Sequence, residues 1–525
     1  MQIQACEATK EKTFEKSWQI FESLTTALQS KVVLAMSHSE LERHMTEKGQ
    51  ELMRQLLQDQ LDFRGIGEAM GPVIGSGGVS RTFPRMRERA LSTIFGEVTV
   101  TRLGYSAHGE ESLFPRDSEL NLPPDLYSHQ LQRQAVDEII KGSFDQAADS
   151  VMSRTRTRIP KRQIEGIARH AAVDFDAFYE ESASVCPVDG KPTSPILVMS
   201  TDGKGIVMRE ESLREKTRRA AAESTHKLSK RLSRGEKDNR KRMAQVAAVY
   251  TIAPFARVAE DVVKDYRTGQ DDGELREKVT RPKPENKRVW ASVAKEPGEV
   301  IEDMFQEALR RDPIHAKQWV VLVDGNATQI SLVREMAKQL GVKVTIIMDV
   351  IHVLEYLWSA GMALHGEGKP LTERWVSEHL LEILRGHSSN VAAGMRRSAT
   401  LRAMKAGERK PIDACARYFL NHRQYLRYDR YLANGYPIAT GVIEGACRYL
   451  VKDRMDITGA RWGLETAEAV LKMRALRTSG NLDAYWAFHE RAEYSRNHLD
   501  QYQGTPPPTH LPVKTRSAKF MRLVN

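Results

Sequence analysis

Two periodicities of apolar and polar residues organise the first part of the chain. Within residues 10–60, apolar positions recur every three or four residues, for example at Leu41 and Met45, which predicts amphipathic helices. The segment RALSTIFGEVTVTRLGYSA instead alternates from residue to residue on each side of Gly96, which predicts a small β-hairpin. We therefore expect residues 1–125 to form a mainly helical N-terminal region that carries this hairpin.

Residues 126–180 contain the pattern of a helix-turn-helix. Ser143 and Gln146 have the spacing of a capping box, and an Ile-Pro pair precedes a second helical segment that begins with Lys161 and Arg162. Two short helices around a basic turn are typical of DNA-binding proteins that place the second helix in the major groove. A helical hairpin with a solvated basic face would give the same pattern, so both interpretations stay open.

From residue 195 onward, short apolar runs alternate with helical patterns, which indicates an α/β domain. The expected strands lie in PILVMSTDGKG, MAQVAAVYTIAP, KRVWASVA, WVVLVDGN and VKVTIIMD. Three of these runs end in an aspartate, namely Asp202, Asp324 and Asp349. Because ligands bind beyond the carboxyl ends of strands in open α/β sheets, we expect these carboxylates to converge, although Asp-Gly is also a favoured turn dipeptide.

Changes in these patterns divide the rest of the chain. A segment with Pro and Gly precedes the first strand, and a long helical, basic stretch without strand patterns follows the last one. The expected parts are a linker at 181–194, a first core part at 195–357, an all-α insertion at 358–439, final core helices at 440–490 and a basic, Pro-containing tail at 491–525.

The stretch GVIEGACRYLVKDRM contains one glutamate followed by basic residues at helical spacing. In an α-helix, Glu444, Arg448 and Lys452 share one face. One interpretation is a ladder of i, i+4 ion pairs, each contributing a few tenths of a kcal/mol. The other is a metal-binding carboxylate followed by two cations that contact a phosphate backbone.

Composition indicates a partner and a compartment. The formal net charge of +10 and the pI near 9.2 favour a polyanionic partner, of which nucleic acid is the commonest. The four cysteines form no CxxC pair, which suits a reducing cytoplasm. There is no secretion-signal pattern and no apolar run long enough to cross a membrane. We expect a cytosolic protein with no membrane partner.

The strand-end carboxylates point to metal-assisted phosphoryl chemistry. Three carboxylates gathered at one place repel one another unless a cation neutralises them. Mg²⁺ (or Mn²⁺) suits such oxygen ligands, and two ions together can assist cleavage of a phosphodiester. The chain has no GxxxxGK[ST] loop, GxSxG elbow or HExxH pair, which argues against an ATPase, a serine hydrolase and a zinc protease.

Several long motifs resemble the ISKra-type insertion-sequence transposases of bacteria, which are DDE transposases related to the Mutator-like and ISL-type groups. The motifs are STDGKGIVMR, HKLSKRLSRGEK, VLVDGN, MDVIHVLEYLW, PIATGVIEGACRYLVKDRMDITGARWGLETAEAVLKMRALR and AYWAFH. The resemblance covers most of residues 195–490. It implies an RNase H-like α/β catalytic domain with an all-α insertion, preceded by a mainly α DNA-binding region.

The resemblance also implies roles for individual residues. Asp202, Asp324 and Glu444 would be the catalytic carboxylates and the ligands of two metal ions. The DVIH motif would make Asp349 and His352 accessory residues, although Asp349 could take the second catalytic position instead. The residues expected to contact DNA are Lys161, Arg162, Lys204, Lys227, Lys230, Arg231, Arg234, Arg448, Lys452, Arg454, Arg461 and Trp462, the last either stacked on a base or part of the core.

The implied activity is cleavage at terminal inverted repeats followed by transfer of the 3′-hydroxyl strand end into target DNA. The implied partners are double-stranded DNA and further copies of the chain, in the nucleoid of a bacterial cytoplasm. Two alternatives remain at this point. One is an RNase H-like nuclease or resolvase without strand transfer, and the other is a domesticated DNA-binding protein without catalysis.

Overall fold

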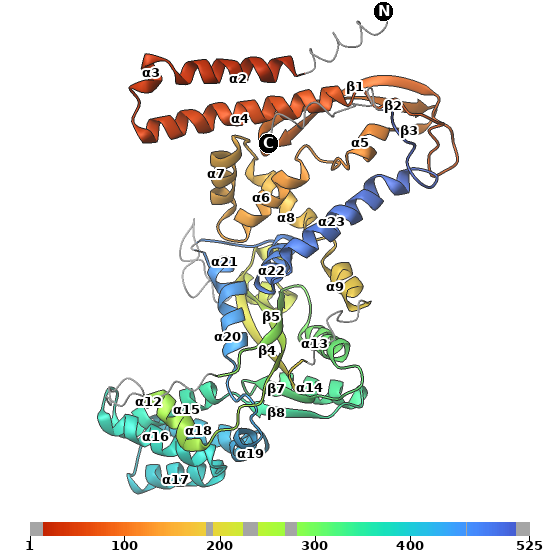
Figure 1. Cartoon of the computed structure of the whole chain (residues 1–525). Helices are drawn as coiled ribbons and strands as arrows, with labels where there is room; N and C mark the ends of the chain where they lie inside the picture. The colour runs from red at the N-terminus through yellow and green to blue at the C-terminus, as the bar shows by residue number, and fades with distance from the viewer. Residues whose placement is uncertain (1–13, 185–192, 224–239, 268–280, 458, 511–525) are drawn as a thin grey trace, which may run out of the picture. The chain divides into compact units, whose positions relative to one another are not determined.

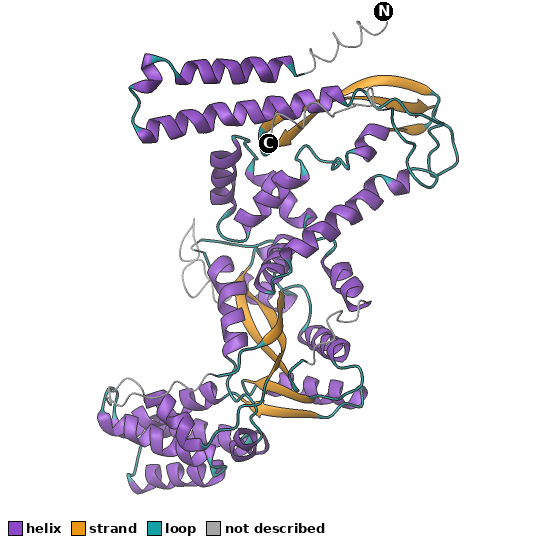
Figure 2. Ribbon diagram, in the orientation of Figure 1, coloured by secondary structure: helices purple, strands orange, loops and turns teal. Residues whose placement is uncertain are grey.

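The chain is a mixed α/β protein that forms two compact units. The computed structural model describes residues 14–184, 193–223, 240–267, 281–457 and 459–510. The first unit comprises residues 1–178 and 483–525, and the second comprises residues 179–482. Each unit contains one β-sheet, and helices form most of the remaining structure (Figure 2). In the described part of the chain, no helix is long and apolar enough to cross a bilayer.

The first unit begins with a helical hairpin and a three-stranded sheet (Figure 1). Its helices are α2 (Glu15–Leu28), α3 (Lys31–Leu34) and α4 (His38–Phe63), and its strands are β1 (Phe83–Thr93), β2 (Gly96–Ala107) and β3 (Glu110–Leu113). Strands β1 and β2 pair antiparallel around the turn that ends at Gly96, which has φ 121°. The expected hairpin is therefore confirmed, with β3 as an additional edge strand.

Five further helices complete the first unit. They are α5 (Pro115–Glu119), α6 (His129–Ile139), α7 (Phe144–Thr155), α8 (Lys161–His170) and α23 (Leu482–Asn497), while α9 (Phe175–Ser184) leads into the second unit. The capping box of α7 is present, because Gln146 N donates to Ser143 Oγ at 3.2 Å and Ser143 N donates to Gln146 Oε1 at 3.0 Å. Helices α6, α7 and α8 pack against one another.

The second unit is built on a five-stranded mixed sheet. Its strands are β4 (Ile196–Val207), β5 (Lys241–Ile252), β6 (Glu285–Ser292), β7 (Gln318–Val323) and β8 (Val344–Met348), in the order β6-β5-β4-β7-β8. Only β5 runs against the other four strands. The central strands are nearly continuous runs of buried Val, Ile, Leu and Ala, as expected for a sheet that helices cover on both faces.

Helices surround this sheet and form a separate helical layer. The helices that lie between or after the strands of this sheet are α10 (Glu215–Ala222), α12 (Ala259–Arg267), α13 (Pro297–Arg311), α14 (Ala327–Gln339) and α22 (Leu464–Thr478). Between β8 and the helix α20 (Gly441–Ala446), the fully described chain contains helices and no strand. These are α15 (Val350–His365), α16 (Pro370–Leu384), α17 (Ser388–Leu401), α18 (Ala406–Asn421) and α19 (Tyr428–Ala433). The helical character expected for residues 358–439 is thus confirmed, although α15 begins directly after β8.

Two expectations about chain segments are corrected. Strand β4 does not end at Asp202 but continues to Val207, because β5 pairs with it along its whole length. Residues 491–510 are not a separate tail, because α23 continues to Asn497 and because Tyr502 and Thr509 form β-bridges with Gly75 and Ala69, respectively. Residues 511–525 of the expected tail lie outside the described residues. A sequence pattern rich in Pro and basic residues did not reveal these pairings with a segment far away in the chain.

Candidate metal-binding site

Three aspartates form a row across neighbouring parallel strands. Ser200 of β4 pairs with Leu322 of β7, and Val323 of β7 pairs with Met348 of β8. Continuing these registers by one or two residues places Asp202 beside Asp324 and Asp324 beside Asp349. Since neighbouring strands lie about 4.8 Å apart, the aspartates meet at the same edge of the sheet. The strand registers therefore place the three aspartates side by side along the backbone, although Asp202 lies within its strand and the other two follow theirs.

Asp349 is fully buried, and all its acceptor positions are used. Its Oδ1 accepts hydrogen bonds from Ile351 N at 3.0 Å and from Thr440 N at 3.3 Å. Its Oδ2 accepts from His352 Nδ1 at 3.1 Å and from Thr440 Oγ1. A carboxylate offers about four lone-pair sites, so Asp349 has none left for a metal ion. It caps α15 and joins that helix to Thr440, the residue before α20.

Asp324 and Asp202 have oxygen atoms that remain available. Asp324 Oδ1 accepts a hydrogen bond from Asn326 N at 2.8 Å, whereas no described residue donates to its Oδ2. Asp202 Oδ1 accepts from Gly203 N at 2.6 Å, and its Oδ2 receives only the weak thiol donor of Cys447, at 3.1 Å. Both carboxylates are half-buried. Their free oxygens distinguish them from Asp349.

The loop after Asp324 is fixed by an aromatic residue of the helical insertion. Gly325 has φ 104°, and a Cβ atom there would lie 2.7 Å from the ring of Tyr418. The Tyr418 hydroxyl donates to the backbone oxygen of Asp324 at 3.0 Å, and the ring stacks on Tyr356. The insertion therefore contributes directly to the position of this carboxylate.

Glu444 lies on α20, whose geometry differs from the expected regular helix. Residues Cys447–Lys452 form a π-helical turn, so Arg448 does not continue the i, i+4 face. Within the described residues, Arg448 pairs with Asp453 at 3.9 Å, and no ion pair joins Glu444 to Arg448 or Lys452. The ion-pair ladder is therefore wrong as an account of Glu444. Short π-helical insertions often occur at functional sites.

Negative charge accumulates around Glu444. Burial raises the pKa of Glu444, and the charges of Asp349, Glu355 and Asp202 raise it further, with His352 partly opposing them. The hydrogen bond to Asp349 raises the pKa of His352 to about 9. Burial, followed by the charge of Asp202, raises the pKa of the Cys447 thiol. The groups thus share one electrostatic environment that a bound cation would stabilise.

The donor set fits a hard divalent ion. The free oxygens of Asp202, Asp324 and Glu444 are the ligand type that Mg²⁺ prefers, and Mg²⁺ needs only one or two carboxylates in addition to water and phosphate. Among the described residues, the ligand atoms of Asp349, His352 and Glu444 lie within 4.8 Å of one another, whereas those of Asp202, Asp324 and Glu444 do not form such a group. We assign Asp349 as the acceptor that orients His352 rather than as a ligand, because its lone pairs are occupied. His352 Nε2 has no hydrogen-bond partner among the described residues.

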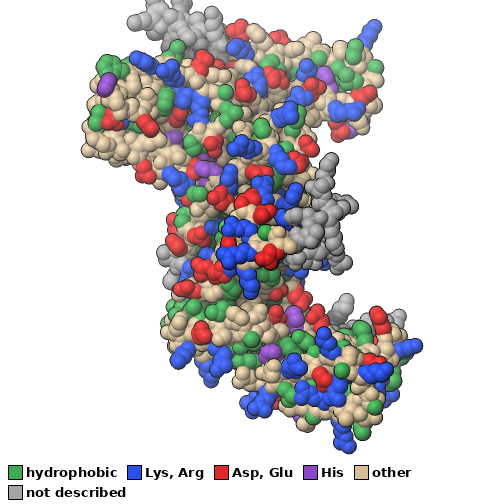
Figure 3. Space-filling model, turned by 180° about the vertical axis from the view of Figure 1, so that it is seen from behind, with side chains coloured by type: hydrophobic (Ala, Val, Ile, Leu, Met, Phe, Trp, Pro, Cys, Tyr) green, Lys and Arg blue, Asp and Glu red, His purple; other side chains and the backbone are tan. Residues whose placement is uncertain are grey.

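The expected DNA-binding residues fall into three groups. Lys161, Arg162, Lys204, Arg448, Lys452 and Arg461 are exposed, although Lys161 is paired with Asp145 at 2.6 Å. Lys227, Lys230, Arg231 and Arg234 lie outside the described residues. Figure 3 shows Lys and Arg side chains mixed with Asp and Glu over the visible face, so the net charge does not form a single patch there.

Trp462 and Arg454 are corrections to the expected DNA-binding set, because both are buried. Trp462 is 4% exposed and Arg454 is 2% exposed, and the guanidinium carbon lies 4.7 Å from the centre of the indole ring. Trp462 N donates to Val207 O at 3.1 Å, and its Nε1 donates to Met455 O at 3.0 Å. Trp462 thus connects the end of β4 to the segment after α20, and Arg454 packs against its ring. Both residues belong to the core.

A groove beside α20 was not found by sequence reasoning. It has a volume of about 390 Å³ and is lined by residues that include Lys283, Lys287, Val289, Gly445 and Tyr449. The Tyr449 side chain is 56% exposed, which is unusual for a large ring. The only sequence signal was Gly445 four residues before Tyr449, and a Cβ atom at Gly445 would lie 3.5 Å from the Tyr449 ring.

No protein-family model matches the sequence, and the curated proteins contain no match.

Proposed function

We propose that the chain is a DDE-type DNA transposase that acts on the ends of a bacterial insertion sequence. The observation that carries this proposal is the row of aspartates at one sheet edge, in which Asp202 and Asp324 each keep a carboxylate oxygen that no strong donor among the described residues occupies. Glu444 lies beside Asp349 at the end of this row. The strand order supports an RNase H-like domain, which is expected to have three antiparallel strands followed by two parallel ones.

Each group of the site has a role in this proposal. Asp202, Asp324 and Glu444 would hold two Mg²⁺ or Mn²⁺ ions, which would supply charge stabilisation to the attacking and leaving oxygens of an in-line displacement. Asp349 fixes His352 and the start of α20, and thereby positions Glu444. His352 lies beside Glu444.

The DNA path follows the surface around α20. Arg448 and Lys452 contact backbone phosphates, which adds affinity without sequence information. Tyr449 offers a ring on which a base can stack, and Lys283 and Lys287 line the same groove. Helices α7 and α8 of the first unit read the terminal inverted repeats in a helix-turn-helix arrangement. Lys161 must exchange its Asp145 partner for a phosphate during this binding.

The reaction proceeds in two displacements. Water attacks the phosphodiester at the end of the element, and the released 3′-hydroxyl then attacks a phosphodiester of the target DNA. Neither step requires a covalent link between protein and DNA. Two copies of the chain pair the two ends of the element in the bacterial nucleoid.

The test is metal-dependent cleavage of a labelled duplex that carries the end of the element's own DNA. Wild type is expected to nick this end in Mg²⁺ or Mn²⁺, and Glu444→Gln to bind the duplex equally well without cutting it. Glu335→Gln, an exposed glutamate on α14, is the matched control and should cut normally. Equal cutting by wild type and Glu444→Gln would refute the assignment of Glu444.

A joining assay separates transposition from simple hydrolysis. A pre-cut end with a free 3′-hydroxyl is incubated with a target plasmid, and the joined product is measured. Joining that depends on Glu444 is expected. Cutting without joining would replace the transposase proposal with a nuclease, and binding without either reaction would indicate a DNA-binding protein that has lost catalysis.

A further inference from the structure

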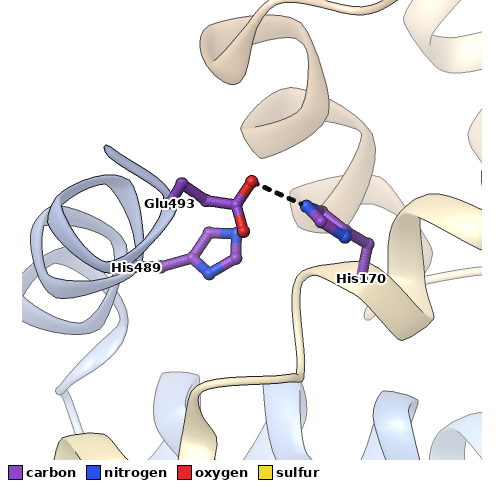
Figure 4. A group of neighbouring side chains, drawn as sticks. All are labelled: His170, His489 and Glu493. Carbon is purple, nitrogen blue, oxygen red and sulfur yellow. Dashed lines mark hydrogen bonds and ion pairs between the residues drawn. The ribbon is translucent and has the colours of Figure 1, made fainter. Parts of the chain in front are cut away.

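A second group of possible metal ligands lies in the first unit, whereas the carboxylate row belongs to the second. His170 is the last residue of α8, and His489 and Glu493 lie four residues apart on α23 (Figure 4). A spacing of four residues places both side chains on one face of the helix. The ligand atoms of the three residues lie within 4.8 Å of one another.

The group is buried and its members point toward one another. The side chains of His489 and Glu493 are each 1% exposed, whereas that of His170 is 29% exposed. His170 Nε2 and Glu493 Oε2 are 3.1 Å apart. Figure 4 shows the His489 ring beside the Glu493 carboxylate, with His170 on the opposite side. Of the three side chains, that of His170 is the one open to solvent.

A carboxylate behind His489 fixes the ring in the orientation that a metal ligand requires. His489 Nδ1 donates to Asp174 Oδ2 at 2.6 Å, and Arg496 donates to both oxygens of Asp174 at 3.0 Å. Histidines that bind metals usually donate their other ring N–H to a carboxylate in this way. The Nε2 atom of His489 is then left with its lone pair on the side of Glu493.

The charged side chains of this group have a net negative charge that one more cation would neutralise. Asp174 and Glu493 carry two negative charges, and Arg496 supplies one positive charge close to both. The remaining negative charge is neutralised either by a proton on a histidine or by a metal ion. Buried charges need such compensation, so the two occupants compete for the same place.

We propose that His170, His489 and Glu493 bind a divalent transition metal, with Zn²⁺ as the best match to two imidazoles and one carboxylate. Tetrahedral Zn²⁺ with bonds of about 2.0–2.1 Å places its ligand atoms about 3.3 Å apart, so small side-chain rotations suffice. Asn497 Nδ2, which donates to Glu493 Oε2 at 2.7 Å, and Arg496 continue to support the carboxylate. The fourth position faces the exposed side of His170 and takes water.

The ion would be structural. His170 and Glu493 are 323 residues apart in sequence, and the ion would join the end of the helix-turn-helix-like segment to the C-terminal helix of the same unit. Binding to the folded state alone stabilises that state, so removal of the ion would loosen this junction first. This role is independent of the reaction proposed for the second unit.

Metal content of the full-length protein tests the proposal. Protein stripped with EDTA is dialysed against Zn²⁺ in a large excess of Mg²⁺, which occupies the oxygen ligands of the carboxylate row. One tightly bound Zn²⁺ per chain is expected, with a rise in Tm that EDTA reverses. His170→Ala should lose the ion and the rise in Tm. His38→Ala, which removes an exposed histidine from α4, should keep both.

Two further measurements make the result specific. Co²⁺ substitution should give visible absorption bands without the near-ultraviolet thiolate band that bound cysteine produces. Glu493→Gln provides a second variant with an unchanged shape, because His170→Ala alone also removes a hydrogen bond. Absence of a stoichiometric ion in wild type would overturn the proposal, and so would equal Zn²⁺ uptake by wild type, His170→Ala and Glu493→Gln.

Discussion

Substitutions of Asp349 test whether this residue binds a metal ion or stabilises the fold through its hydrogen bonds. Both donors to Oδ1 are backbone N–H groups, of Ile351 and Thr440, and these must keep an acceptor. The partners of Oδ2 are the hydroxyl of Thr440 and Nδ1 of His352, both of which can also accept hydrogen bonds. Asp349→Asn can therefore satisfy all four partners, with its amide nitrogen in the place of Oδ2.

The structure gives different magnitudes for two substitutions of Asp349. Asn replaces charge-assisted bonds by neutral ones, which are about half as strong, so we expect a loss of about 1–2 kcal/mol of unfolding free energy. Ala leaves two backbone N–H groups without an acceptor at a site that is 0% exposed. At about 1–3 kcal/mol for each group, Asp349→Ala should cost about 2–6 kcal/mol.

Urea unfolding and Mn²⁺ titration of the same proteins provide the measurement. Asp349→Asn should still fold, with the loss of about 1–2 kcal/mol given above, and keep its Mn²⁺ affinity. Asp324→Asn should remain stable and bind Mn²⁺ about tenfold more weakly. The reverse pattern, with Mn²⁺ binding lost in Asp349→Asn and retained in Asp324→Asn, would refute the assignment. Asp349 would then be the second metal ligand despite its four hydrogen bonds.

Three other substitutions test the core, the groove and the acid response. Trp462→Ala should cost about 3–5 kcal/mol in urea unfolding, and a loss of DNA affinity without a loss of stability would contradict its place in the core. Tyr449→Ala should weaken DNA binding about tenfold in a fluorescence titration, while Tyr449→Phe retains it, and an unchanged affinity for both would remove the stacking role. Burial opposes ionisation of Glu307, but the charges of Arg288 and Arg311 outweigh it and lower its pKa. The ionised Glu307 therefore contributes stability above its unfolded-state pKa, and this contribution is lost as the pH falls through its folded-state pKa. On acidification, wild type should lose more unfolding free energy than Glu307→Gln.

Local patterns in the sequence determined much of the second unit. The order of strands and helices followed from apolar runs and helical periodicity, and Asp324 and Asp349 were correctly placed directly after strands β7 and β8. The capping box at Ser143 and the hairpin at Gly96 also depended on neighbouring residues alone. These features could be read because short-range hydrogen bonding and side-chain alternation decide them.

The tertiary structure decided which of these side chains are free to act. Asp349 loses its lone pairs to Thr440, a residue 91 positions away, and Trp462 is buried by its pairing with β4. A π-helical turn follows the helix of Glu444, and the expected ion-pair ladder does not form there. His170 contacts Glu493, which is 323 residues away in the sequence. Spacing along one helix cannot predict such contacts, because burial and hydrogen-bond saturation depend on residues that folding brings together.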